Sequence, residues 1–353
     1  MPTPTAAAGP LTQSGQISFR LPDPEERLAG VRLGADHGNP LAGAPFERRE
    51  GEWSLTAPAP DLGRFEYVLE LEHAGGGDAE RVPDPANPLH APGAFGDKSV
   101  VELPGYAPPP WLELEGVDGR RDGFAVPSTA LGADVEVELW SPADAGAGEE
   151  LPLLVAHDGP EYDRLAALTR FSATQIAAGA LPRHRVALLA PGDRDQWYSA
   201  SALYARTLAR RVLPAIAGAV AVGAPVGLGA SLGGLAMLHA HRSHPATFDG
   251  LLLQSASLFM PRHDAHEGGF PRYRRIVRFV RGLSREEPPR LVPVGLTCGH
   301  LEENVHNNRA VARTLAAAGY PTELREVRDL HNYTAWRDAL DPHLTDLLRT
   351  VWS

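Results

Sequence analysis

The sequence predicts a two-domain α/β protein, in which a doubly wound, mostly parallel sheet follows a smaller N-terminal β-sandwich. In the second part, six apolar runs alternate with helix-forming stretches, which is typical of such a sheet. The runs lie at 153–156, 186–190, 225–229, 250–254, 291–297 and 322–327. In the first part, apolar and charged residues alternate in short runs punctuated by Gly and Pro, which indicates a sandwich. We therefore expect domains at 16–110 and 111–353.

Length and composition agree with two domains and exclude some partners. A chain of 353 residues exceeds most single cores, and its hydrophobic content of 43% suffices for two. Residues 1–15 are rich in Pro, Thr, Ala and Gly and are expected to be disordered. The net charge of −11 argues against nucleic acid and anionic membranes as partners.

The sequence also predicts a cellular location. The single cysteine, Cys298, excludes intramolecular disulfides. Residues 1–15 have neither the basic nor the apolar region of an export signal. No apolar run reaches the roughly 18 residues of a membrane span. These features predict a protein of the reducing cytoplasm.

The elements follow one another along the chain as this fold requires. The sandwich begins with the alternation of Ile17, Phe19 and Leu21, and 104–110 reads as a semi-rigid linker. Trp111 opens the second domain, and 135–139 alternates as an antiparallel lead-in strand. The chain is expected to close with an amphipathic helix. Its apolar positions are Trp336, Leu340, Leu344 and Leu347.

Ser231 carries the strongest chemical signal. It lies in Gly229-Ala230-Ser231-Leu232-Gly233, between an apolar strand and a helix-forming stretch. In that context G-x-S-x-G predicts a nucleophile elbow, where the helix N-terminus and the N–H of Leu232 face the serine oxygen. The alternative is a Gly-rich helix start with a capping serine.

A serine of this kind needs an acid and a histidine, in that chain order. His331 follows the last predicted strand, 322–327, and is the candidate general base. Glu302 and Glu303 both follow the penultimate strand and could orient His331. We favour Glu302, although either residue could instead cap the helix that starts near Asn304.

The second oxyanion donor should come from the loop after the first parallel strand, 151–156. There the backbone N–H of Gly159 is the candidate partner for Leu232, because Pro160 has no N–H. For the neighbouring His157 and Asp158 we expect a role in fixing the loop. The polar segment 263–267 lacks convincing ligand spacing, so we expect no metal site there.

Taken together, these segments resemble the enterochelin (ferric enterobactin) esterases and the wider esterase D-like group of α/β-hydrolases. The resemblance covers 111–353 well and extends more loosely upstream, from Arg81 to Trp111. It departs from the family pattern in having Gln196-Trp197 for Glu-Leu, Ala256 for Gly, and Pro160. It rests on the elbow at 229–234, Gln254-Ser255-Ala256-Ser257, Asp158-Gly159, Arg194-Asp195-Gln196-Trp197-Tyr198, and His331 with Trp336.

The resemblance implies a cytoplasmic serine esterase without metal or cofactor, which opens the trilactone of a catecholate siderophore and so releases iron. Arg194 would attract the anionic substrate, or else pair with a neighbouring carboxylate. Trp197 and Tyr198 would stack on a catechol, or else pack the loop. Alternatives are a feruloyl or acetyl carbohydrate esterase, a general carboxylesterase, and an inactive binding protein.

Overall fold

The computed structural model describes residues 9–353 and divides the chain into two compact units. The second unit consists of Pro108–Cys298, Asn304–Val327 and Tyr333–Ser353. The first unit extends to Ala107 and also includes Gly299–Glu303 and Arg328–Asn332. Two short segments from the C-terminal part of the sequence therefore group with the N-terminal part, which a single cut near residue 110 does not predict.

The first unit contains two antiparallel sheets. One has the order β1-β2-β5-β4, and the other β3-β6-β9-β8 with β7 paired to β6. The strands are β1 (Leu11–Gln13), β2 (Gln16–Pro22), β3 (Leu28–Ala35), β4 (Glu47–Arg49), β5 (Glu52–Pro58), β6 (Arg64–His73), β7 (Glu80–Val82), β8 (His90–Ala91) and β9 (Lys98–Glu102). Of the segment 1–15 expected to be disordered, 11–13 forms β1 and pairs with β2, while 1–8 lies outside the described residues.

The core of this unit is built from alternate residues of its strands, because successive side chains of a strand point to opposite faces. Ile17 and Phe19 of β2 meet Phe65 and Tyr67 of β6, and the rings of Phe19 and Tyr67 stand edge to face at 5.2 Å. Each fully buried side chain of this kind contributes about 1.5–3 kcal/mol. Leu330, from the C-terminal segment 328–332, is fully buried in the same core.

The second unit is built on one sheet with the strand order β10-β11-β13-β12-β14-β15-β16-β17. The pairs from β13 through β16 in this order are parallel, while β10 and β11 are antiparallel additions at one edge. The strands are β10 (Gly119–Val126), β11 (Val135–Pro142), β12 (Leu151–His157), β13 (Arg185–Leu189), β14 (Val222–Ala230), β15 (Gly250–Gln254), β16 (Val294–Gly299) and β17 (Thr322–Val327). The doubly wound sheet predicted from the sequence is confirmed.

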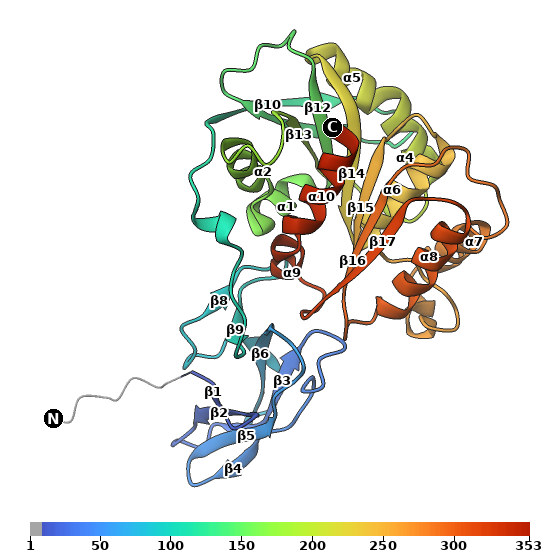
Figure 1. The fold of residues 1–353 in the computed structure, drawn as a ribbon. Helices are drawn as coiled ribbons and strands as arrows, with labels where there is room; N and C mark the ends of the chain where they lie inside the picture. The colour runs from blue at the N-terminus through green and yellow to red at the C-terminus, as the bar shows by residue number, and fades with distance from the viewer. Residues whose placement is uncertain (1–8) are drawn as a thin grey trace. The chain divides into compact units, whose positions relative to one another are not determined.

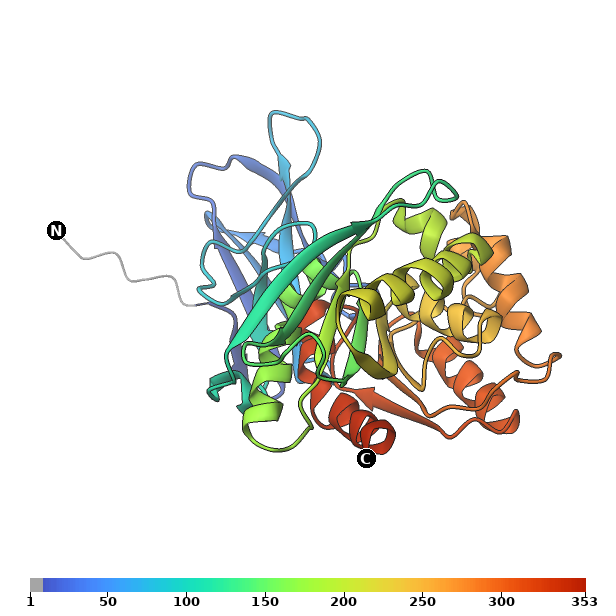
Figure 2. The same cartoon turned by 90° about the horizontal axis from the view of Figure 1, so that it is seen from above.

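Helices cover both faces of this sheet, because each face carries apolar side chains. Figure 1 shows α1, α2 and α10 on one side of the strands and α6 and α8 on the other, and Figure 2 keeps the two groups apart. The first layer holds η1 (Pro110–Glu113), α1 (Gly159–Ala166), α2 (Leu168–Ala177), α9 (Tyr333–Asp338), η4 (Leu340–Leu344) and α10 (Thr345–Trp352). The second holds α3 (Arg194–Tyr198), α4 (Ala202–Thr207), η2 (Leu208–Val212), α5 (Leu213–Ala219), α6 (Leu232–Ser243), α7 (Tyr273–Gly282) and α8 (Val305–Ala317).

Three local details differ from the sequence expectations. The strand expected at 291–297 begins at Val294, since Pro293 has no N–H for the sheet. The terminal helix is interrupted, because Asp341, before Pro342, has extended backbone angles. Strand β10 was not predicted. Among the helices of residues 9–353, none has the length and apolar character needed to cross a membrane.

Candidate active site

Ser231 occupies a sharp turn between β14 and α6. Its backbone angles, φ 55° and ψ −126°, are strained for a residue with a side chain. The turn is tight, since a Cβ on Gly229 would come 2.4 Å from the backbone of Gly233. The strand, turn and helix that the motif predicted are therefore present, with Ser231 at the start of the helix.

Residues at and just after the end of β15 form hydrogen bonds with both the N–H and the carbonyl of Ser231. The N–H of Ser231 donates to the carbonyl of Gln254 at 2.9 Å, and the N–H of Ser257 donates to the carbonyl of Ser231 at 3.1 Å. The Ser231 and Ser257 hydroxyls are hydrogen-bonded at 3.2 Å. The sequence alone indicates no role for Ser257, although it lies in the segment that carries the family resemblance.

Behind the elbow, a buried polar network braces the end of β15. The Tyr162 hydroxyl donates to Oε1 of Gln254, and Nε2 of Gln254 donates to the carbonyl of Trp336 at 3.0 Å. The indole of Trp336 donates to the hydroxyl of Ser255 at 3.0 Å. Because Tyr162 is on α1 and Trp336 on α9, this network fixes both helices to the strand that holds Ser231.

The loop after β12 brings a second helix N-terminus beside the first. Strands β12 and β14 are parallel neighbours, so α1 and α6 begin at the same edge of the sheet. Gly159 is the first residue of α1, and a Cβ there would lie 2.3 Å from the Cα of Leu188. First-turn N–H groups, such as those of Gly159 and Leu232, have no acceptor within their own helix. Two such termini favour negative charge at this edge.

Arg194 fixes this loop through Asp158. Asp158 has a left-handed backbone (φ 52°) and is buried. Its two carboxylate oxygens accept hydrogen bonds from Nε and Nη2 of Arg194, both at 2.8 Å. Two roles were considered for Arg194, and the structure shows the one in which it pairs with a neighbouring carboxylate. The Arg194 side chain remains 36% exposed.

His157, at the end of β12, connects the loop to the elbow. It is fully buried. Its Nδ1 lies 2.9 Å from the carbonyl of Gly233, and its Nε2 lies 2.8 Å from the hydroxyl of Tyr204. Burial, together with the charge of Arg194, lowers the pKa of His157 to about 4, although the bond to Gly233 opposes this. A neutral ring that donates from Nδ1 and accepts at Nε2 satisfies both contacts.

Trp197 and Tyr198 lie in the apolar layer on the α6 side of the sheet. They are 2% and 0% exposed. Tyr198 stacks on His157, and its hydroxyl accepts a hydrogen bond from the N–H of Asp158 at 3.3 Å. Trp197 stacks on Tyr204. This burial favours packing of the loop over stacking on a ligand. Tyr204 was missed, because its partner lies 47 residues away in sequence.

In the first unit, His331 faces Glu302. Oε1 of Glu302 lies 3.6 Å from Nδ1 of His331, and Oε2 accepts the N–H of Gly299 at 3.1 Å. The Glu302 side chain is fully buried, whereas that of His331 is 25% exposed. The loops that carry the two residues touch, since a Cβ on Gly299 would lie 2.2 Å from the carbonyl oxygen of Asp329.

The surroundings of His331 raise its pKa above the ordinary 6.5. Desolvation is the largest single influence and lowers the pKa, but the raising influences, led by Glu302, together outweigh it. Glu303 and Asp36 add weaker charge effects in the same direction. Of the two glutamates considered, Glu302 is thus the one whose side chain interacts directly with the imidazole.

The polar segment 263–267, for which we expected no metal site, has a structural arrangement of its own. Asp264 is buried, and its two oxygens accept hydrogen bonds from Nδ2 of Asn307 at 3.0 Å and from the N–H of Met260 at 2.5 Å. These bonds fasten the segment to α8 and to the chain after β15. The segment ends in the short helix η3 (Ala265–Gly269).

The fold and this site define a class of protein. A doubly wound sheet with a strained serine on a strand–turn–helix elbow is the arrangement of an α/β-hydrolase-type esterase. The chain belongs to the esterase family described as "Putative esterase", whose model matches residues 128–347. The protein is therefore a carboxylic ester hydrolase, as the sequence predicted.

Solved structures show the same fold. An enterobactin esterase from Shigella flexneri, determined in the presence of enterobactin, matches with a TM-score of 0.77 at 20% identity, over 98% of this chain and 97% of that one. A ferric enterobactin esterase from Salmonella typhimurium gives 0.78 at 19% identity, over 98% of each chain. A ferulic acid esterase gives 0.57 at 17% identity, over 66% of this chain and 98% of that one. No curated protein matches the sequence.

Proposed function

We propose that this esterase hydrolyses the ester bonds of a catecholate siderophore trilactone and thereby releases its iron. The observation that carries the proposal is the extent of the fold likeness. The enterobactin esterases match over 97–98% of both chains, which includes the N-terminal sandwich, whereas the ferulic acid esterase covers 66% of this chain. A sandwich shared with enzymes of one substrate class favours that class.

The proposed mechanism is acyl transfer through Ser231. His331 takes the proton of Ser231, whose oxygen attacks the ester carbonyl, and Glu302 holds the imidazole with its Nδ1 proton. The N–H groups of Gly159 and Leu232 stabilise the oxyanion. His331 then gives its proton to the leaving alcohol and afterwards activates the water that cleaves the acyl-enzyme. Each of the three side chains follows the end of a sheet strand: β14, β16 or β17.

The roles proposed for the predicted substrate-binding residues differ from one another. Arg194 keeps a partly exposed guanidinium beside the proposed oxyanion loop, so it can also attract the anionic ferric chelate. Trp197 and Tyr198 are buried, and in this proposal they stabilise the loop by packing. In this proposal they shape the site without touching substrate.

The test is hydrolysis of ferric and iron-free trilactone siderophore beside p-nitrophenyl acetate and methyl ferulate. Ser231→Ala and His331→Ala serve as controls, and we expect each to abolish turnover. Trilactone cleavage faster by orders of magnitude than that of the simple esters would support siderophore hydrolysis. Fast cleavage of simple esters with an intact trilactone would refute it, and a preference for methyl ferulate would favour a feruloyl esterase.

A further inference from the structure

Arg64 is a buried charge at the start of β6. The period-two pattern of this strand places Arg64 and Glu66 on the face opposite the core residues Phe65 and Tyr67, where solvent would be expected. Both charged side chains are nevertheless buried, at 2% and 3% exposure. A buried guanidinium is tolerated only where carboxylates and other acceptors surround it.

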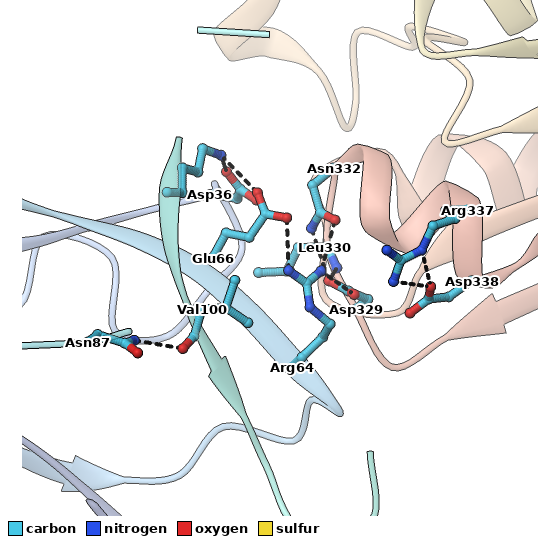
Figure 3. Close-up of polar contacts among 11 residues, drawn as sticks. Asp36, Arg64, Glu66, Asn87, Val100, Asp329, Leu330, Asn332, Arg337 and Asp338 are labelled. Carbon is cyan, nitrogen blue, oxygen red and sulfur yellow. Dashed lines mark hydrogen bonds and ion pairs between the residues drawn. The ribbon is translucent and has the colours of Figure 1, made fainter. Parts of the chain in front are cut away.

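Two of the acceptors flank His331 in the sequence, and the third is Glu66. Nη1 of Arg64 donates to Oδ2 of Asp329 at 3.1 Å and to Oδ1 of Asn332 at 3.2 Å. Nη2 donates to Oε1 of Glu66 at 2.9 Å. Figure 3 shows the guanidinium between Glu66 on one side and Asp329 with Asn332 on the other. One side chain of the sandwich thus holds the histidine loop at two points.

Asp329 transmits this hold to the backbone of the loop. Its Oδ1 accepts the N–H of Leu330 at 2.7 Å and Nδ2 of Asn332 at 3.0 Å. Leu330 is buried in the sandwich core, and the carbonyl of Arg328 accepts the N–H of Gly63 at 2.6 Å. The residues on both sides of His331 are therefore anchored, which leaves its ring directed toward Glu302.

The sandwich also contacts the loop of the acid. Gly38, with a left-handed φ of 96°, approaches so closely that a Cβ there would lie 2.0 Å from the carbonyl oxygen of Leu301. Leu301 itself packs against the sandwich core. Both loops that carry the acid and the base are thus held from the N-terminal sandwich, at 36–38 and at 61–66.

We propose that Arg64 is a positioning residue for the general base, because its hydrogen bonds to Asp329 and Asn332 fix the loop that aims His331 at Glu302. The proposal rests on the role proposed above for His331. The 3.6 Å between Nδ1 and Oε1 leaves little tolerance, so a shift of this loop would lose the contact. The sandwich thereby contributes to the chemical step through the guanidinium of Arg64.

The test compares Arg64→Met, Arg64→Lys and Asp329→Asn in the full chain, with Arg81→Met as the matched control. Arg81 is on β7 of the same sandwich, is 64% exposed and pairs with Glu70. For Arg64→Met and Asp329→Asn we expect kcat for p-nitrophenyl acetate to fall roughly 10- to 100-fold while KM changes less than about threefold. Arg64→Lys should restore part of the loss, and Arg81→Met should match the wild type.

The second readout is the pKa of His331, measured by NMR on the histidine ring protons and assigned by their loss in His331→Gln. We expect this pKa to fall in Arg64→Met and in Asp329→Asn, since a displaced ring loses the influence of Glu302. Should Arg64→Met fail to fold, Asp329→Asn decides, because asparagine has nearly the size of aspartate and the change leaves Arg64 paired with Glu66.

An unchanged kcat together with an unchanged His331 pKa would overturn the proposal, even if the variants melt at a lower temperature. That result would assign Arg64 to stability alone. Failure of the proposed role of His331 has a different signature, namely full hydrolysis by His331→Ala. Failure of the siderophore proposal is seen as an intact trilactone beside fast cleavage of simple esters. In either case the NMR measurement still reports whether Arg64 positions the ring.

Discussion

At the scale of the residue, Glu302 raises the pKa of His331, the proposed general base. A general base works only when neutral, so kcat/KM should fall as the pH drops below the raised pKa of His331. Glu302→Gln removes the main influence that raises this pKa. We therefore expect the acid limb of the pH–rate profile to move to lower pH, while the plateau rate falls roughly 10²- to 10⁴-fold.

Glu303→Gln is the matched control, because Glu303 acts on His331 only through charge. Its plateau rate should stay within about threefold of the wild type, since Glu303 is a weaker influence on His331 than Glu302. Complete pH–rate profiles with p-nitrophenyl acetate check both expectations. Equal losses in the two variants would contradict the assignment of Glu302 as the acid.

Arg194 has two possible uses that kinetics can separate. Its pair with Asp158 shapes the proposed oxyanion loop, which every ester substrate would need. We expect Arg194→Met to lower kcat roughly 10- to 100-fold for neutral and anionic esters alike. A role confined to substrate attraction would instead raise KM for the anionic siderophore and leave p-nitrophenyl acetate unaffected. Steady-state kinetics on both substrates distinguish these outcomes.

The residue scale is also where prediction from the sequence reached its limit. Ser231 could be identified from the sequence, because the glycines of its motif and the flanking strand and helix are its neighbours in the chain. The partners of Asp158 and His157 lie 36 and 47 residues away, and those of Arg64 lie 265 and 268 away. Such pairs depend on the finished fold, and no local pattern specifies them. The burial of Arg64 runs against the pattern of its own strand.

At the scale of the element, glycines set how closely strands and helices approach. The Cβ of Gly159→Ala would collide with backbone atoms of β13, which cannot rotate away as a side chain can. We expect this variant to lose about 2–3 kcal/mol of unfolding free energy, together with its esterase activity. Urea unfolding and hydrolysis assays measure the two effects.

Gly123→Ala is the control for this substitution. Gly123 lies on β10, and a Cβ there meets no atom within 4 Å. Its stability should stay within about 0.5 kcal/mol of the wild type. A Gly159→Ala protein as stable and active as Gly123→Ala would show that α1 can move away from β13 without consequence.

Burial accounts for most of the strands that could be predicted, although β17 was predicted without a fully buried residue. Strands β12, β13, β15 and β16 and the second half of β14 are almost wholly buried, so each contains an apolar run that is visible in the sequence. In β10 only Val126 is fully buried, because the strand lies at an edge, and its sequence therefore shows no run. The terminal helix has a continuous apolar stripe, but Pro342 interrupts it, since proline disfavours helical angles in the preceding residue.

At the scale of the whole molecule, two buried histidines make stability depend on pH. His157 and His184 are fully buried, and burial lowers the pKa of each to about 4. In the unfolded chain they titrate near 6.5, so the unfolded state binds their protons first as the pH falls. Stability is thus at its full value above about pH 6.5 and is lost between that pH and 4. At pH 5 each histidine costs about 2 kcal/mol.

Urea unfolding at pH 7 and pH 5 measures this loss. We expect His184→Gln to reduce the difference between the two pH values by about 2 kcal/mol, because glutamine does not titrate. His90→Gln, which removes an exposed histidine, is the control for the loss of a histidine side chain as such. A His184→Gln protein with the pH dependence of the wild type would show that the folded state accepts the His184 proton.

The division of the chain at this scale could be predicted only in part. Composition and periodicity placed a boundary near 110, and the two units meet in the sequence between Ala107 and Pro108. They could not indicate that Gly299–Glu303 and Arg328–Asn332 group with the first unit. Those segments are short loops whose sequence resembles that of any strand end. Their membership depends on Leu330 and Asp329, whose partners are in the sandwich.

This membership has a consequence for how the protein is made. Translation supplies residues 9–107 long before Leu330 and Asp329, so the nascent sandwich lacks part of its core and holds Arg64 and Glu66 without Asp329. Ribosome-bound chains that end near residue 300 should therefore be more sensitive to protease in the sandwich than the released protein. The sandwich is thus completed only after Asp329 and Leu330 have been synthesised.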